Sequence, residues 1–326
     1  MSISLSLFKW FLKAAGVKAK YDRPAEDINR MKEKINKNRT FTLKPMKGQH
    51  VEYKEILGRQ VLVIRDERAS GRALLYLYGG GFTSEISGIE KKAAVKFGYR
   101  SVRDVWIPRY PSCIDVSVRE IYHMALETYR EMLKSYQPED IAVIGFSAGA
   151  DIALGMFEYN NTLDKPLPAA RLMIVSSPAC EPITEEERQR IRELSDRDIM
   201  ISASFMDTVI PTMRHGEKLP GYMTQFSTGD LSHMPYTHIY YGSDEVLSAA
   251  ADRLVEAFHR DGTECELHIG DGLFHCYPAV DLFPETKPAF DEIVRYLSEF
   301  QSISFFTKVR RNLENGALLW YAVRHG

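Results

Sequence analysis

The stretch Ile141-Ala-Val-Ile-Gly145-Phe-Ser147-Ala-Gly149-Ala-Asp151 decides the fold of this chain. Its first four residues are apolar and can form a buried strand, and apolar residues at 152, 154 and 156 begin a predicted helix. A strand, a sharp turn and a helix are the context that a G-x-S-x-G nucleophile elbow requires. Glycines at 145 and 149 allow the tight turn that lifts the Ser147 hydroxyl clear of the sheet. We interpret Ser147 as a candidate nucleophile, the alternative being an ordinary strand-to-helix turn.

Composition narrows the class of protein. The chain has 326 residues, of which 44% are hydrophobic and 26% charged, as in an ordinary globular protein large enough for one big α/β domain or two smaller ones. Lys and Arg total 42 against 44 for Asp and Glu, so the net charge of -2 gives no reason to expect nucleic acid as a partner. We expect a small-molecule partner.

The cysteines and the N-terminus bear on compartment and cofactors. The four cysteines are far apart and form no C-x-x-C, which argues against a zinc site or a redox pair: Cys113, Cys180, Cys265 and Cys276. We therefore expect reduced thiols, a cytoplasmic location, no metal and no cofactor. Lys9 and Lys13 interrupt the apolar N-terminus, which argues against a signal peptide. No stretch reaches the roughly 18 consecutive apolar residues of a membrane span.

The patterns of two segments predict helices that cover other parts of the protein. Residues 3–17 predict an amphipathic helix that covers apolar surface of its own protein, with a membrane-surface anchor as the alternative. Residues 181–234 separate two predicted strands and are best interpreted as an inserted helical lid. A charged helix within 21–40 and a C-terminal tail, 301–326, that docks on the body are further expectations.

The predicted strands alternate with predicted helices and imply a mostly parallel sheet flanked by helices, an α/β fold. The strand candidates are 51–56 and 61–64, which form a hairpin, then 73–78, 102–108, 141–144, 172–175, 237–241 and 264–269. The helix candidates are 118–133, 184–194, 247–260 and 287–300.

A serine nucleophile needs a base, and the base needs an acid that orients it. Asp244 follows one predicted strand and His275 follows the next, so both belong at the carboxyl edge of the sheet. Glu245 is a rival acid, but Asp244 comes first after the strand; Asp244 could equally be a helix N-cap. We interpret the other histidines considered as structural: His233, His238 and His268.

Acyl transfer also needs donors for an oxyanion, and a glycine-rich loop after a strand can supply bare backbone amides. Gly79-Gly80-Gly81 directly follows the strand candidate 73–78. No G-K-[ST] or G-x-G-x-x-G accompanies it, which argues against a phosphate loop. The candidate donors are the amides of Gly80, Gly81 and Ala148.

These motifs resemble the hormone-sensitive-lipase-like family of α/β-hydrolases, which includes many bacterial carboxylesterases. The resemblance covers most of the chain and rests on Tyr78-Gly79-Gly80-Gly81-Phe82, Gly145 to Gly149, Gly242-Ser243-Asp244-Glu245, and His275. Three residues depart from the family pattern: Tyr78 replaces the usual His, Phe146 the usual Asp, and Ala150 a common glycine. We expect the first two to change the tuning of the site and not to abolish activity.

The resemblance implies a single α/β-hydrolase domain over 1–326, with a helical cap formed by 1–45 and the insertion 181–234. It implies a serine carboxylesterase for short to medium acyl esters, with Ser147, Asp244 and His275 as the triad. A carbohydrate acetyl-esterase, a receptor-like protein without catalysis and a membrane-associated lipid enzyme remain alternatives. The sequence leaves open whether the protein is a homodimer.

Overall fold

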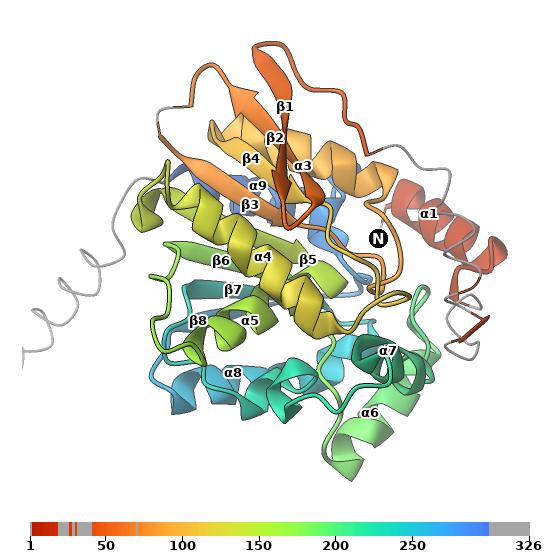
Figure 1. Ribbon diagram of the computed structural model, residues 1–326. Coiled ribbons are helices and arrows are strands. Elements are labelled where there is room, and N and C mark those ends of the chain that lie inside the picture. The colour runs from red at the N-terminus through yellow and green to blue at the C-terminus, as the bar shows by residue number, and fades with distance from the viewer. Residues whose placement is uncertain (1, 19–25, 28–29, 31–40, 70, 300–326) are drawn as a thin grey trace, which may run out of the picture.

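The computed structural model describes residues 2–18, 26–27, 30, 41–69 and 71–299 (Figure 1). The C-terminal tail 301–326 lies outside the described residues. So does most of 21–40, where a charged helix was expected as part of the cap.

An eight-stranded sheet forms the centre of the structure, in the order β1-β2-β4-β3-β5-β6-β7-β8. Its strands are β1 (Gln49–Ile56), β2 (Arg59–Asp66), β3 (Ala73–Leu77), β4 (Asp104–Pro108), β5 (Ile141–Phe146), β6 (Leu172–Ser176), β7 (Tyr236–Gly242) and β8 (Cys265–Gly270). The first two strands form the predicted hairpin, and β2 also pairs antiparallel with β4. The other neighbours are parallel.

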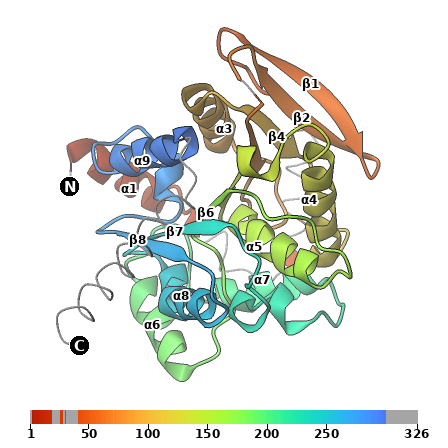
Figure 2. The same cartoon turned by 90° about the vertical axis from the view of Figure 1, so that its left-hand side faces the viewer.

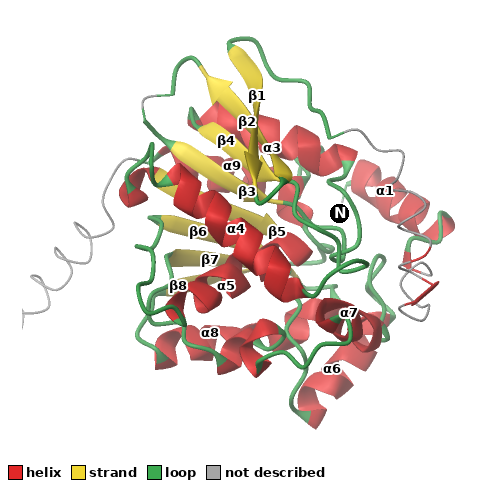
Figure 3. Ribbon diagram, in the orientation of Figure 1, coloured by secondary structure: helices red, strands yellow, loops and turns green. Residues whose placement is uncertain are grey.

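Helices cover both faces of this sheet. In Figures 2 and 3, α3 and α9 lie on one face, and α4, α5 and α8 lie on the other. The described α-helices are α1 (Ile3–Ala14), α3 (Gly88–Ser101), α4 (Val118–Met132), α5 (Ala148–Asn161), α6 (Glu185–Ser195), α7 (Phe205–Arg214), α8 (Ala251–Arg260) and α9 (Lys287–Ser298). Short 3-10 helices span Pro138–Asp140, Gly221–Met223, Phe226–Thr228, Val246–Ala250 and Tyr277–Ala279.

The burial of the strands explains their sequences. Every residue of β3, β4, β5 and β6 is buried, because helices cover both faces of these strands, and their sequences are nearly continuous apolar runs. Only one residue of β1, at the edge of the sheet, is buried. The expectation of a mostly parallel α/β sheet flanked by helices is confirmed.

The insertion between β6 and β7 contains α6 and α7. Together with α1 these helices lie at the right of Figure 1, beyond the carboxyl ends of the parallel strands. Phe8 of α1 contacts the rings of Phe274 and Phe283, with centroid distances of 5.5 and 5.0 Å. Within the described residues, we find no helix with the length and apolar character needed to cross a bilayer.

Two glycines allow β3, β5 and α5 to approach one another closely. A Cβ on Gly149 would lie 2.0 Å from the Leu77 carbonyl oxygen of β3, and a Cβ on Gly145 would lie 2.2 Å from the Gly149 carbonyl oxygen. Both contacts are to backbone, which cannot rotate away. Glycine is therefore required at both positions by packing.

We predict that Gly149→Ala lowers the free energy of unfolding by about 3 kcal/mol, because the new methyl group overpacks the contact between α5 and β3. Gly88→Ala is the matched control, since Gly88 also lies in the first turn of a helix but a Cβ there meets nothing within 4 Å. Its effect should stay within about 1 kcal/mol. Urea denaturation measures both, and equal stabilities of the two variants would refute the packing argument.

Candidate active site

Ser147 occupies the turn between β5 and α5 in a backbone conformation that is rare for serine. Its φ of 53° and ψ of -127° lie outside the usual regions for a residue with a side chain. The Ser147 amide donates to the Ser176 carbonyl at the end of β6, 2.8 Å away, which anchors the turn to the neighbouring strand. The strand, turn and helix around Ser147 are those expected from the motif.

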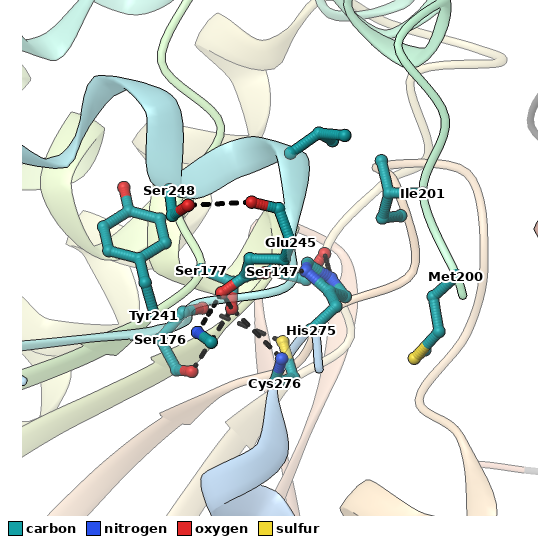
Figure 4. A network of polar contacts seen from close by, with 12 residues as sticks. Ser147, Ser176, Ser177, Met200, Ile201, Tyr241, Glu245, Ser248, His275 and Cys276 are labelled. Carbon is teal, nitrogen blue, oxygen red and sulfur yellow. Dashed lines mark hydrogen bonds and ion pairs between the residues drawn. The ribbon is translucent and has the colours of Figure 1, made fainter. Parts of the chain in front are cut away.

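A chain of hydrogen bonds links Ser147 to two further side chains (Figure 4). His275, in the loop after β8, has its Nε2 2.9 Å from the Ser147 Oγ. Its Nδ1 lies 2.8 Å from Oε2 of Glu245, in the loop after β7. His275 and Glu245 are both buried. This arrangement can take a proton from the serine hydroxyl and stabilise the imidazolium that results.

The structure contradicts the expectation that Asp244 is the acid next to His275. Asp244 instead contacts two cations: Lys9 Nζ lies 3.2 Å from its Oδ2, and Arg197 Nη2 lies 2.8 Å from its Oδ1. Lys9 also donates to the Gly272 carbonyl at 2.6 Å. Asp244 therefore connects α1 and the insertion to the loops of the site.

The turn after β7 explains why the second acidic residue and not the first points inward. The Asp244 amide donates to the Leu273 carbonyl, and the Glu245 carboxylate folds back to accept from the Gly242 amide at 2.6 Å. Ser177 donates its hydroxyl to the same oxygen, Oε1, at 2.9 Å, which leaves Oε2 for His275. The sequence alone left two neighbouring acids, Asp244 and Glu245, as candidates. The hydrogen bonds that hold Glu245 have no sequence motif from which they could be predicted.

The glycine loop lies directly against the elbow. A Cβ on Gly79 would be 2.8 Å from the Phe146 carbonyl oxygen and 3.0 Å from the Ser147 Cβ. The Gly79 amide donates to Glu90 Oε1 at 2.6 Å, and Ser87 donates to Glu90 Oε2 at 3.0 Å. Glu90 is a supporting residue that the motif analysis missed, because its only sequence signal is the ordinary capping pattern at the start of α3.

Two of the three residues whose amides the motifs suggest as donors, Gly80 and Gly81, line the same cavity as Ser147, and Ala148 follows Ser147 in the chain. Gly80 and Gly81 have φ values of +117° and +59°, which favour glycine. In the part of the chain that the structure describes, their amides donate to no protein acceptor. Ala148 is the first residue of α5, so its amide has no partner within the helix.

The pKa of His275 lies well above its ordinary value. Burial by itself lowers this pKa, but the Cys276 side chain and the Glu245 carboxylate raise it. Burial also raises the pKa of the Cys276 thiol, so that the thiol is uncharged at neutral pH. The carboxylate is therefore the charge that stabilises protonated His275. Burial similarly raises the pKa of Glu90.

A cavity of about 370 Å³ opens beside Ser147 and His275. Its walls are mostly apolar and come from the glycine loop, α1, the insertion and the loop after β8. The large apolar side chains are Phe8, Phe11, Leu12, Ile89, Phe146, Met200, Ile201, Phe205, Phe274 and Val280. Met200 and Ile201 face the hydrogen-bonded residues across the site (Figure 4). The cavity has the size and lining of a small-molecule site.

Two departures from the family pattern have structural partners. The buried ring of Tyr78 stacks on Tyr110 with a centroid distance of 4.3 Å. The buried ring of Phe146 contacts Tyr76 and Phe97 and lines the cavity. Both residues pack beside the loop and the elbow, and neither contacts His275 through a hydrogen bond in the described chain.

Residues 74–279 match the alpha/beta hydrolase fold family, which is more than half of the chain. An acetyl-hydrolase of Streptomyces hygroscopicus is 26% identical over 229 residues, which are 66% of this chain and 71% of that protein. The match to the family model confirms the resemblance to α/β-hydrolases drawn from the motifs.

Solved structures share the fold over most of their length. The crystal structure of EstE5 soaked with p-nitrophenyl butyrate superposes with a TM-score of 0.76 at 19% identity, covering 92% of this chain and 99% of that one. An esterase from the bacterial hormone-sensitive lipase family superposes with a TM-score of 0.74 at 18% identity, covering 91% and 98%. The chain belongs to the alpha/beta hydrolase fold family.

Proposed function

We propose that this protein hydrolyses carboxylic esters through Ser147, His275 and Glu245. The observation that carries the proposal is the unbroken chain of hydrogen bonds from the Ser147 hydroxyl through His275 to the buried Glu245 carboxylate. A receptor without catalysis would not need a base aligned on a strained serine. Glu245 takes the role that the sequence assigned to Asp244.

In this mechanism His275 Nε2 accepts the proton of Ser147 as Oγ attacks the ester carbonyl. Glu245 accepts from Nδ1, holds the imidazole in the required tautomer and stabilises its positive charge. His275 then protonates the leaving alcohol, and an acyl group remains on Ser147. Water, deprotonated by the same histidine, releases the acid and restores the serine.

The oxyanion that forms in both steps needs donors placed before the reaction begins. We propose the amides of Gly80, Gly81 and Ala148, as expected from the motifs. Their support is the close approach of the glycine loop to Ser147 and the positive φ of both loop glycines. The hydrogen bond from Gly79 to Glu90 holds the loop in place.

We propose that α1 and the insertion form the cap over the acyl pocket. Both contribute apolar side chains to the cavity, and both are tied to Asp244 by Lys9 and Arg197. A cavity of about 370 Å³ favours short to medium acyl chains over long ones. The name of the acetyl-hydrolase relative supports acyl groups as short as acetyl.

We expect p-nitrophenyl acetate and butyrate to be hydrolysed faster than the palmitate ester, because the cavity is too small for a long chain. Ser147→Ala should lower kcat by roughly 10⁶-fold. Steady-state kinetics across the series, with urea unfolding of the variant as a control for folding, checks both points. Turnover that survives in Ser147→Ala, or wild-type protein that cleaves neither p-nitrophenyl nor carbohydrate acetyl esters, would overturn the proposal.

The two neighbouring acids should differ sharply when each loses its charge. Glu245→Gln keeps the size of the side chain but removes the carboxylate from His275, and kcat should fall by about 10³–10⁴-fold. Asp244→Asn is the matched control and should change kcat by less than about 10-fold, because Asp244 pairs with Lys9 and Arg197 and not with His275. The reverse ranking on p-nitrophenyl butyrate would restore Asp244 as the acid.

The pH profile should report the raised pKa of His275. Only neutral His275 can accept the serine proton, so activity is lost as the pH falls through this pKa. The acidic limb of kcat/KM should therefore have its midpoint above the ordinary histidine value of about 6.5. In Glu245→Gln the residual activity should titrate at lower pH, whereas Cys276→Ser should keep the wild-type midpoint. An unchanged midpoint in Glu245→Gln would disprove the role of the carboxylate.

A further inference from the structure

A second cluster of chemically active side chains lies on β7 and β8, within the strands that lead into the loops of Glu245 and His275. His238 of β7 pairs with Glu266 of β8 in the parallel register, and His268 follows two residues later. Because side chains alternate along a strand, Glu266 and His268 lie on the same face. One nitrogen from each histidine and one carboxylate oxygen lie within 4.8 Å of one another.

The distances among these atoms match the dimensions of a metal centre. His238 Nδ1 is 3.0 Å from His268 Nε2, Glu266 Oε2 is 3.6 Å from His238 Nδ1, and the same oxygen is 3.9 Å from His268 Nε2. A triangle with these sides has a circumscribed radius of about 2.05 Å, which falls within the range of zinc–nitrogen and zinc–oxygen bonds. An ion at its centre would lie at bonding distance from all three atoms without a change in their separations.

From this geometry we propose that His238, His268 and Glu266 bind a divalent first-row transition ion, with Zn²⁺ as the representative case. Two imidazoles and a carboxylate are a ligand set that such ions accept, and three protein ligands leave a position for water. Glu266 is half exposed, so an ion can enter from solvent at the open edge of β8. The argument against zinc from the cysteine spacing does not apply to a site formed by two histidines and a carboxylate.

The surroundings of the cluster favour the required tautomers. Glu292 of α9 has its Oε2 3.8 Å from His268 Nδ1, which favours a proton there and leaves the Nε2 lone pair for an ion. Tyr240 and Tyr296 donate to the two oxygens of Glu292 at 3.0 and 3.1 Å and hold it in place. Without an ion, His238 Nδ1 can donate a hydrogen bond to His268 Nε2. When an ion binds His238 Nδ1, His238 takes its other tautomer, with the proton on Nε2.

Aromatic rings hold both imidazoles in position. Tyr296 stacks on His238 with a centroid distance of 3.8 Å, and Tyr240 stacks on His268 at 4.3 Å. Ligands held in this way lose little freedom when they bind an ion, which favours affinity. The bound ion would cross-link β7 to β8 and stabilise the sheet edge that supports the acid and the base.

Isothermal titration of the full chain with Zn²⁺, after treatment with a chelator, tests the site. We expect one equivalent to bind and, at an excess of about 100 times Kd, to raise Tm by about 4 °C. Substitution with Co²⁺ should give the visible spectrum of nitrogen and oxygen ligands without a thiolate charge-transfer band. No binding, or a thiolate band, would overturn the proposal by excluding the site or assigning the ion to a cysteine.

Variants locate the ion. Glu266→Gln keeps the shape of the side chain, and His268→Phe keeps a ring to stack on Tyr240; each should weaken Zn²⁺ binding by at least roughly 10–100-fold. Glu264→Gln is the matched control, because it removes the same charge from an exposed residue just before β8, and its affinity should equal that of the wild type. Equal affinity in all three variants would refute the site, and circular dichroism verifies that each is folded.

Discussion

The close contact between β3, β5 and the start of α5 is the constraint on which the site depends. Gly145 and Gly149 let three backbone segments approach within distances that no side chain would allow. This contact fixes the elbow at the carboxyl end of a buried strand, with Ser147 in a strained conformation. The glycine loop after β3 can then lie against the same turn, since a Cβ on Gly79 would reach the Phe146 carbonyl. The candidate nucleophile and the candidate oxyanion donors thus share one packing constraint.

Parallel strands bring the remaining groups to the same edge of the sheet. The loops after β7 and β8 are neighbours because their strands pair directly, and they carry Glu245 and His275. Each loop is held by buried polar contacts, including the Ser177 hydroxyl on Glu245. Burial of an ion pair is costly unless its hydrogen bonds are satisfied, and here the carboxylate accepts from a backbone amide, a hydroxyl and an imidazole. These donors keep the Glu245 carboxylate aligned with His275.

The elements above the site are joined to it through charge as well as apolar contact. Asp244 receives Lys9 from α1 and Arg197 from the insertion, and Phe8 packs on the loop next to His275. The covering of the pocket and the acid loop are therefore coupled at one residue. Asp244, although adjacent to Glu245, therefore pairs with these two cations and does not pair with His275.

Local pattern in the sequence determined the fold class, the elbow at Ser147, the glycine loop and His275 as the candidate base. These features depend on neighbours in the chain: apolar runs make buried strands, and glycines at fixed spacing allow a tight turn. The choice between Asp244 and Glu245 was decided only by the tertiary structure, because it depends on Ser177, Lys9 and Arg197, which come from distant segments. The cluster of His238, Glu266 and His268 is of the same kind, since strand pairing brings together side chains that appear as isolated residues in the sequence.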